Sequence, residues 1–373
     1  MTRIKFKTHG KGQKTDLTAL LHIIPSFAFG GQQARLATLI DGLGAEFSHH
    51  IVALDGDHSA RGLVSENANV AYSSFAMKKS SGISLTNIRG LMGVIKKCKP
   101  VIVCTYNWGS IEAVIANRAG PNIPNLHFED GFGPDEKIDQ QSNKRVLGRR
   151  FLLRQSMVIV PSHGLERAAR EQWKLKNVRR VENGIDLARF DRPRPTGERV
   201  NIGSLGSLRP EKNYSRLITA FRALESSFDA QLVIVGEGTE RQSLAARIGD
   251  TSNIMLPGAT SSPADAIATF DLFALSSDTE QAPISLMEAM AAGLPVVSTD
   301  VGDIREMVSD ENKPYITALG DEHAYHAAME ALIESPALRK TIGLANQQKA
   351  RSTFSRDQMI NRYTEIFSEI VAR

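Results

Sequence analysis

Two glutamates and two cations form the most chemically suggestive group in this sequence. Glu280 and Glu288 stand eight positions apart in TEQAPISLMEAMAAG, and Arg209 and Lys212 stand in GSLRPEKNYS, just before a predicted amphipathic helix. Carboxylates accept hydrogen bonds from paired hydroxyl groups, arginine bridges two phosphate oxygens, and lysine supplies a point charge. The four residues therefore suit a ligand that carries both hydroxyls and a diphosphate. The alternative interpretation is that Glu280 caps a helix, Glu288 faces solvent, and the cations lie in a solvated loop.

A glycine pair near the start of the chain could place backbone amides beside the same ligand. Gly30 and Gly31 follow a predicted strand, residues 19–24, and open a predicted helix, residues 31–44. Glycine lets the backbone approach a ligand closely, and the first amides of a helix favour anions. A purely structural turn explains the pair equally well, because the spaced G-x-G-x-x-G of dinucleotide sites is absent.

Short β-rich runs alternate with segments of helical periodicity along the chain, which predicts βαβ units and parallel sheets. In the first half, strands are predicted at residues 19–24, 49–55, 101–106, 125–129 and 157–162, and helices at 31–44, 84–97 and 163–172. In the second half, strands are predicted at residues 199–206, 231–238, 253–258, 271–277 and 294–300, and the chain from Asp321 onward is predicted to be helical. The predicted fold class is α/β, with two Rossmann-like, doubly wound domains that face each other across a cleft.

One segment interrupts this alternation and suggests a domain boundary. The stretch DLARFDRPRPTGER, from Asp186 to Arg199, has two prolines and many charges, as linkers do. We expect an N-terminal domain over residues 1–185, the linker over 186–199, a C-terminal domain over 200–355, and a final helix over 356–373 that can pack back on the N-terminal domain.

The composition is that of a globular protein and excludes several other classes. The 373 residues are 42% hydrophobic and only 6% aromatic, which leaves little to build base-stacking surfaces, so nucleic acid is not an expected partner. Cys98 and Cys104 are too few for a disulfide framework and lack histidines at metal-ligand spacing. The start MTRIKFKTHGKGQKTD has no apolar signal-peptide core, and no apolar stretch is long enough to predict a transmembrane helix. We expect a cytoplasmic protein.

Together, the Glu280–Glu288 spacing, the R-x-x-K of Arg209 and Lys212, the glycine pair and the NGID turn at residues 183–186 resemble the retaining GT-B glycosyltransferases of family 4. The similarity runs from about residue 20 to 370 and is most specific over residues 203–304. It implies transfer of a sugar from a nucleotide diphosphate-sugar, with a UDP-sugar favoured and a GDP-sugar next. The implied acceptor is a glycan or glycolipid of cell-surface polysaccharide or lipopolysaccharide synthesis. No metal and no further cofactor are expected, because protein cations would neutralise the diphosphate.

The resemblance also implies roles for individual residues. Glu288 would bind the ribose hydroxyls, Glu280 would lie near the transferred sugar, and Gly31 would offer its amide to the phosphates. The full donor-binding set is Gly30, Gly31, Arg209, Lys212, Glu280, Ala282, Pro283, Ile284, Ser285 and Glu288, and the catalytic set is Glu280, Arg209, Lys212 and His127. Gln281 and Ala282 stand where the family commonly has glycine after its first glutamate, which is a departure from the pattern.

The segment LHFEDGFGPDE supplies the candidates on the acceptor side. The family usually places a histidine near the transferred sugar, and His127, at the end of a predicted strand, is the candidate. Glu129 and Asp130 are expected to face the cleft and contact acceptor hydroxyls, and Asn183 is assigned to the same side. The alternatives are a satisfied histidine at a strand end and two acidic residues that cap the following turn.

A basic segment in the first half, NKRVLGRRFLLRQ at residues 143–155, mixes cations with apolar residues. Its cations are Lys144, Arg145, Arg149, Arg150 and Arg154. On a helix this composition favours an anionic membrane surface or a phosphorylated lipid acceptor, and it would bring the protein to the inner face of the cytoplasmic membrane. The ordinary alternative is a core-facing helix with a solvated basic face.

Other functions on the same scaffold stay open from the sequence. One is a catalytically silent protein that binds a sugar nucleotide or glycan, since fold does not guarantee activity. Another is a GT-B sugar-nucleotide epimerase, for which no matching set of acids and bases is evident. A dinucleotide-dependent oxidoreductase is disfavoured by the missing glycine fingerprint.

Overall fold

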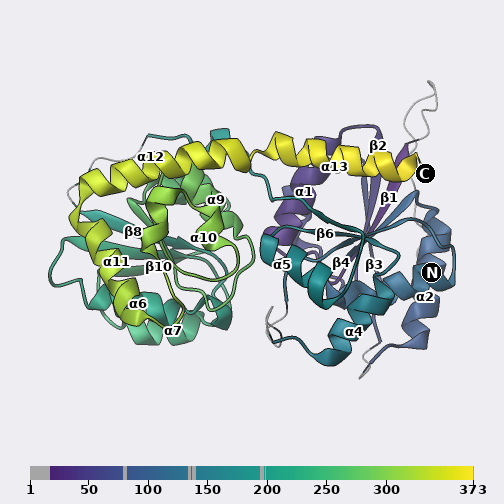
Figure 1. The fold of residues 1–373 in the computed structure, drawn as a ribbon, viewed down its shortest axis with the longest axis horizontal. Helices are drawn as coiled ribbons and strands as arrows, with labels where there is room; N and C mark the ends of the chain where they lie inside the picture. Colours follow the sequence, from purple (N-terminus) through teal and green to yellow (C-terminus); the bar gives the residue numbers. More distant parts are fainter. Residues whose placement is uncertain are drawn as a thin grey trace.

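The computed structural model of the protein describes residues 17–78, 82–132, 136, 140–193, 197 and 199–372. The basic start at residues 1–16 and part of the expected linker, residues 194–196 and 198, lie outside this part of the chain. Figure 1 shows two lobes, each built around one sheet, with the long helices of the C-terminal end lying across both. Of the described helices, none is both long and apolar enough to cross a membrane.

Each lobe contains one parallel sheet whose strand order reverses near its middle. The described strands are ordered β3-β2-β1-β4-β5-β6-β7 in the N-terminal lobe and β10-β9-β8-β11-β12-β13 in the C-terminal lobe. The reversals fall between β1 and β4 and between β8 and β11, as in doubly wound folds, where ligands bind beyond the carboxyl ends of the strands. The predicted fold class is therefore confirmed.

The N-terminal lobe alternates strands and helices along the chain. Its strands are β1 (Thr18–Ile24), β2 (Phe47–Ala53), β3 (Val70–Ser74), β4 (Ile102–Tyr106), β5 (Asn125–Phe128), β6 (Met157–Val160) and β7 (Val178–Arg180). Its helices are α1 (Gly31–Leu43), α2 (Leu85–Cys98), α3 (Ile111–Ala119), α4 (Asn143–Leu152) and α5 (His163–Arg167), and α5 continues into a π-helical turn, Ala168–Gln172. The central strands are buried on both faces because helices cover both sides of a parallel sheet.

The C-terminal lobe repeats the plan. Its strands are β8 (Val200–Leu205), β9 (Ala230–Val235), β10 (Ile254–Gly258), β11 (Leu272–Leu275), β12 (Val296–Thr299) and β13 (Ile316–Thr317). Its helices are α6 (Tyr214–Arg222), α7 (Arg241–Ile248), α8 (Pro263–Ala268), α9 (Ile284–Ala291), α10 (Ile304–Met307), α11 (Glu322–Glu334) and α12 (Pro336–Thr353). The last helix, α13 (Arg356–Val371), leaves this lobe.

Three strands were not predicted, and all are short or lie at a sheet edge. β3 (VAYSS) ends the N-terminal sheet on one side and is only partly buried, so it lacks a continuous apolar run. β7 (VRR) ends the same sheet on the other side, and β13 has two residues. Their pairing depends on a neighbouring strand, which single-sequence periodicity does not reveal.

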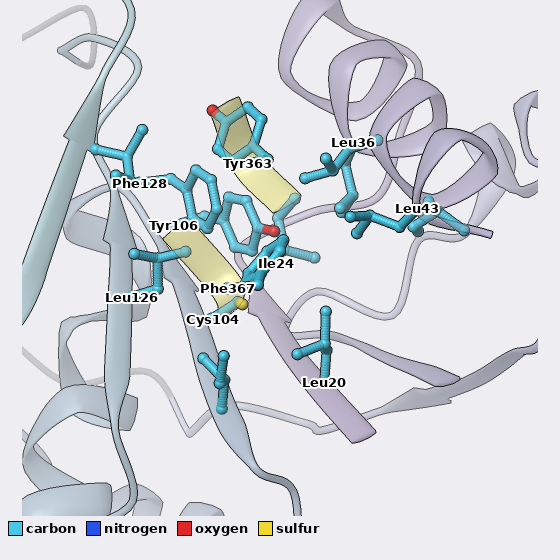
Figure 2. Close-up of a cluster of buried hydrophobic side chains, with 14 of the residues drawn as sticks. Leu20, Ile24, Leu36, Leu43, Cys104, Tyr106, Leu126, Phe128, Tyr363 and Phe367 are labelled. Carbon is cyan, nitrogen blue, oxygen red and sulfur yellow. The ribbon is translucent and has the colours of Figure 1, made fainter. Parts of the chain in front are cut away.

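Helix α13 packs on the N-terminal lobe through one apolar stripe. Met359, Tyr363 and Phe367 are spaced four residues apart and are almost completely buried. Figure 2 shows Tyr363 and Phe367 beside Tyr106 and other core residues of the sheet. The C-terminal end of the chain therefore completes the core of the first lobe.

The chain crosses between the lobes twice, and the two crossings are hydrogen-bonded to each other. Ile185 donates its amide to the Phe354 carbonyl at 2.9 Å, and the Arg356 amide donates to the Ile185 carbonyl at 3.0 Å. A Cβ on Gly184 would lie only 2.6 Å from the Ser355 carbonyl oxygen, so glycine is needed for this close approach. The two segments that join the lobes are therefore held against each other.

Candidate active site between the lobes

Lys212 and Glu280 come together in the C-terminal lobe although 68 positions separate them. Lys212 ends a short 3₁₀ turn after β8, and Glu280 lies in the loop between β11 and α9. The ammonium donates to Glu280 Oε1, and the Ser277 hydroxyl donates to the same oxygen at 2.8 Å. The two charged side chains are 15% and 11% exposed, so the pair is largely shielded from water and has a fixed geometry.

Arg209 does not join this pair in the structure. Its Nε lies 3.1 Å from Glu211 Oε1, and its side chain is 56% exposed. Arg209 lines a hollow of about 230 Å³ together with Glu240 and Asp278. These acidic residues disfavour a diphosphate there, so Arg209 can act on a donor only if its exposed side chain turns toward Lys212.

Glu288 lies on α9, eight positions after Glu280. Among the residues that the structure describes, no hydrogen-bond donor reaches its carboxylate. Burial raises its pKa to about 7, and the charge of Arg189 opposes that shift. A carboxylate desolvated in this way is ready to accept hydrogen bonds from ligand hydroxyls.

The first turns of α1 and α9 face each other across the lobes. A Cβ built on Gly31 would lie 3.4 Å from Ile284 Cδ1, so the amino end of α1 touches the amino end of α9. Pro283 is the N-cap of α9, and Ile284 and Ser285 are its first residues. Free amides at both helix starts make this contact suitable for an anion. Gly30, the N-cap of α1, has extended backbone.

Arg35, which the sequence did not single out, links Asp130 and Asn183 at the helix α1 that makes this contact. Arg35, on α1, is 4% exposed, donates to both Asp130 oxygens, and also donates to Asn183 Oδ1 at 3.3 Å. Asn183 Nδ2 in turn donates to the Ala282 carbonyl at 3.4 Å. Asp130 raises the pKa of Arg35, whose charge is thereby secured despite burial. The available signal was an arginine one helical turn after Gly31 in an otherwise apolar segment.

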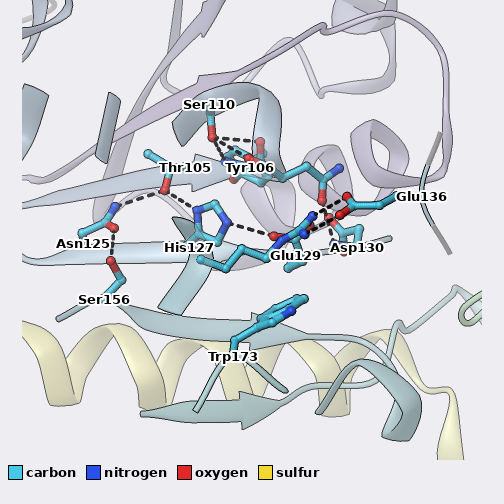
Figure 3. A network of polar contacts seen from close by, with 12 residues as sticks. Thr105, Tyr106, Ser110, Asn125, His127, Glu129, Asp130, Glu136, Ser156 and Trp173 are labelled. Atoms are coloured by element: carbon cyan, nitrogen blue, oxygen red, sulfur yellow. Dashed lines mark hydrogen bonds and ion pairs between the residues drawn. The ribbon is translucent and has the colours of Figure 1, made fainter. Parts of the chain in front are cut away.

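His127 and Glu129 lie inside the N-terminal lobe, as Figure 3 shows. Both are 0% exposed; the Thr105 hydroxyl lies 2.8 Å from His127 Nδ1, and Glu129 Oε2 lies 3.3 Å from His127 Nε2. This differs from the expectation that Glu129 faces the cleft, because Arg149 draws the carboxylate inward at 3.4 Å. His127 has the satisfied strand-end environment that was the alternative interpretation.

Arg149 corrects the view of the basic segment at residues 143–155. It was counted among the cations of a membrane-facing helix, yet its side chain is 1% exposed. Its guanidinium pairs with Glu129 and Glu136 and lies 4.8 Å from the centre of the Trp173 ring. A buried carboxylate pair attracts this arginine, so it belongs to the core and not to the surface of α4.

The two lobes, each with a doubly wound parallel sheet, define a protein of the GT-B fold class, and comparison with known proteins supports this. The Glycosyltransferase Family 4 model matches residues 29–189, and the model of Glycosyl transferases group 1 matches residues 186–349. The chain belongs to the group 1, family 4 glycosyltransferases.

Individual relatives are distant. N-acetyl-alpha-D-glucosaminyl L-malate synthase of Bacillus anthracis is 24% identical over 60% of this chain and 62% of that protein. Lipopolysaccharide core biosynthesis glycosyltransferase LpsD of Rhizobium meliloti is 24% identical over 54% of this chain and 60% of that protein. The matched region thus spans less than two thirds of either relative. The structure of Anabaena Alr3699/HepE in complex with UDP-glucose superposes with a TM-score of 0.78 at 17% identity, covering 94% of this chain and 99% of that one.

Proposed function

We propose that this protein transfers a sugar from a UDP-sugar to a glycan or glycolipid acceptor, with retention of the anomeric configuration. The observation that carries the proposal is the Lys212–Glu280 pair, because Glu280 lies in the loop that leads into α9, the helix whose start touches the start of α1. A cation and a carboxylate at one end of this loop and helix amides at its other end suit a diphosphate joined to a sugar. The family membership, the UDP-glucose complex of a structural neighbour and the lipopolysaccharide relative support the same assignment.

In the proposed reaction the bond between the sugar and the diphosphate breaks, and an acceptor hydroxyl forms a new bond on the same face of the sugar. Lys212 and the helix amides stabilise the negative charge that develops on the departing UDP, and Arg209 adds to them once it turns inward. Preorganised charges of this kind are commonly the largest catalytic contribution. Glu280 orients Lys212 and contacts the sugar, Glu288 binds the ribose hydroxyls, and a diphosphate oxygen takes the acceptor proton. Protein cations do the neutralising, so no metal is required.

Thermal-shift measurements with UDP, GDP and ADP test the donor assignment, because a ligand that binds only the folded state raises its melting temperature. We expect UDP to give the largest shift. A larger shift with GDP would overturn the choice of base. The absence of a shift with all three nucleotides would refute the proposed donor site.

Transfer assays with EDTA and with product analysis test the reaction. We expect unchanged turnover in EDTA and a product of the same anomeric configuration as the donor, measured by NMR coupling constants. Loss of turnover that magnesium restores would contradict a metal-independent mechanism, and donor turnover to an epimer without acceptor would favour the epimerase alternative.

We also propose that α4 brings the protein to the inner face of an anionic membrane. Arg149 is buried, but the exposed surface of α4 still presents Leu147 and Phe151, which are 50% and 57% exposed. These two residues lie beside the exposed cations Lys144, Arg150 and Arg154. Leu147 and Phe151 are four residues apart and share one helix face. Two apolar side chains among three cations match an anionic lipid surface.

Cosedimentation with vesicles tests this contact. We expect binding to phosphatidylglycerol vesicles but not to phosphatidylcholine vesicles, and loss of binding in the Leu147→Ser, Phe151→Ser double variant. Leu344→Ser, at a site on α12 that is 59% exposed, serves as the matched control. Equal binding of the double variant and the control would refute the role of α4.

A further inference from the structure

Asp303 makes an unusual contact between the lobes. It is the N-cap residue of α10 in the C-terminal lobe, but its side chain makes no capping bond to α10. Instead, its Oδ1 accepts the Gly164 amide at 3.0 Å and its Oδ2 accepts the His163 amide, both at the start of α5 in the N-terminal lobe. The carboxylate is thus diverted from its own helix to a helix of the other lobe, and Asp303 is only 6% exposed.

The start of α5 is completed by this contact. The Ser162 hydroxyl accepts the Leu165 amide at 3.1 Å, so the three first amides of the helix are bonded only when Asp303 supplies acceptors for two of them. The bonds join a full negative charge to backbone donors at the positive end of a helix. They are therefore stronger than neutral hydrogen bonds, and they exist only while the lobes have this arrangement.

The same residue holds the loop that carries Glu280. The Asp303 amide donates to the Gln281 carbonyl at 2.9 Å. Gly302, at φ +60, lies so close that a Cβ there would be 2.4 Å from the Glu280 carbonyl oxygen. Any movement of Asp303 toward α5 is therefore passed directly to the backbone of Glu280 and Gln281.

Gln281 adds a second contact of the same loop with the N-terminal lobe. The Ser162 hydroxyl lies 3.3 Å from Gln281 Oε1, and a Cβ on Gly131 would lie 3.3 Å from Gln281 Cγ. Gly131 follows β5 and stands next to Asp130. The loop between Glu280 and α9 is thus held from both the α5 side and the β5 side of the other lobe.

We infer that Asp303 is a positioning residue: by docking on α5 when the lobes close, it fixes the Glu280 loop for transfer. The inference rests on the proposed donor site, because Glu280 and Lys212 are the groups that it positions. It gives Gln281, which replaces the usual glycine, a role in the same lobe contact. UDP is proposed to bind mainly through Lys212 and Glu288 of the C-terminal lobe, which do not need this contact, whereas the transfer step does.

The experiment compares Asp303→Ala and Asp303→Asn with Asp300→Asn. Asp300 lies in the same segment, but its carboxylate bonds to Arg305 within its own lobe, so it is a matched control. Hydrogen exchange of the amides of His163 and Gly164 reports on the contact without any ligand. We expect faster exchange in both Asp303 variants, most in Asp303→Ala, and no change in Asp300→Asn.

Kinetics separate positioning from a general structural role. With UDP as the binding probe and UDP release from UDP-glucose as the rate, we expect an unchanged Kd for UDP and a kcat lowered about 10-fold or more, the scale of a lost charge-assisted hydrogen bond. Asp303→Asn, which keeps one acceptor, should fall between wild type and Asp303→Ala. Unchanged exchange, or a Kd that weakens in parallel with kcat, overturns the inference. If wild-type protein binds no UDP, the proposed function fails instead, and the exchange measurement still decides whether the contact forms.

Discussion

Glu288 leads to the sharpest prediction, because its pKa of about 7 lies within the range where an enzyme can be assayed. If the ionised carboxylate binds the ribose hydroxyls, donor affinity is full above pH 7 and declines as the pH falls and the carboxylate takes up a proton. From pH 8 to pH 6 the ionised fraction falls about 10-fold, which corresponds to about 1.4 kcal/mol of binding free energy. Apparent affinity should fall by the same factor.

Isothermal titration calorimetry at pH 6, 7 and 8 measures this effect. A UDP-sugar is the proper ligand, because free UDP has a phosphate ionisation near pH 6, as phosphate monoesters do, which would add its own pH dependence. Glu288→Gln should bind more weakly at pH 8 and should lose the pH dependence, whereas Glu365→Gln, on the exposed face of α13, should behave as wild type. A flat profile in the wild type, or a slope that persists in Glu288→Gln, would refute the ribose assignment.

Three further outcomes follow from other parts of the structure. Lys212→Met should lower kcat about 100-fold or more, because it removes a preorganised cation from the leaving diphosphate, and a steady-state assay of UDP release should detect it. Burial lowers the pKa of His49 to about 4, so the unfolded chain binds a proton below pH 6.5 that the folded chain excludes. Burial also lowers the pKa of His22, which is hydrogen-bonded to His49. Urea unfolding should therefore show a loss of stability from pH 7 to pH 5 to which His49 contributes about 2 kcal/mol, and a smaller loss in His49→Gln. Arg149→Met should destabilise the N-terminal lobe by about 3 to 5 kcal/mol in the same unfolding assay, because it leaves Glu129 buried without its cation and removes one of the two cations of Glu136, the other being Arg145. A stability loss below about 1 kcal/mol would show that water reaches those carboxylates.

The elements that build the site were largely predictable from the sequence. Gly31 begins α1 and Pro283 caps α9, as expected from the turn and capping preferences of these residues. The apolar runs of β1, β4 and β8 to β12 were recognisable because both faces of a parallel sheet are buried. These signals are local: each depends on residues within a few positions of one another.

The partners of the polar side chains were not predictable in the same way. Arg149 has a helical pattern that fits a basic surface equally well, and only the packing of α4 against Glu129 and Glu136 turns it inward. Glu129 changes from a candidate acceptor contact to a buried ion-pair member for the same reason. Alternation along a strand says which residues share a face, but not which face is covered.

What the sequence by itself determined is the succession of most strands and helices, the fold class, and the candidate residues for a diphosphate and hydroxyls, since periodicity and residue chemistry are properties of the chain itself. The tertiary structure alone decided which of those residues meet. It joins Lys212 to Glu280, pairs Arg209 with Glu211, and bonds Asp303 to an amide 140 positions away. The physical reason is that a side chain's partner is set by how whole elements pack, and that packing brings together groups between which the sequence contains no local signal.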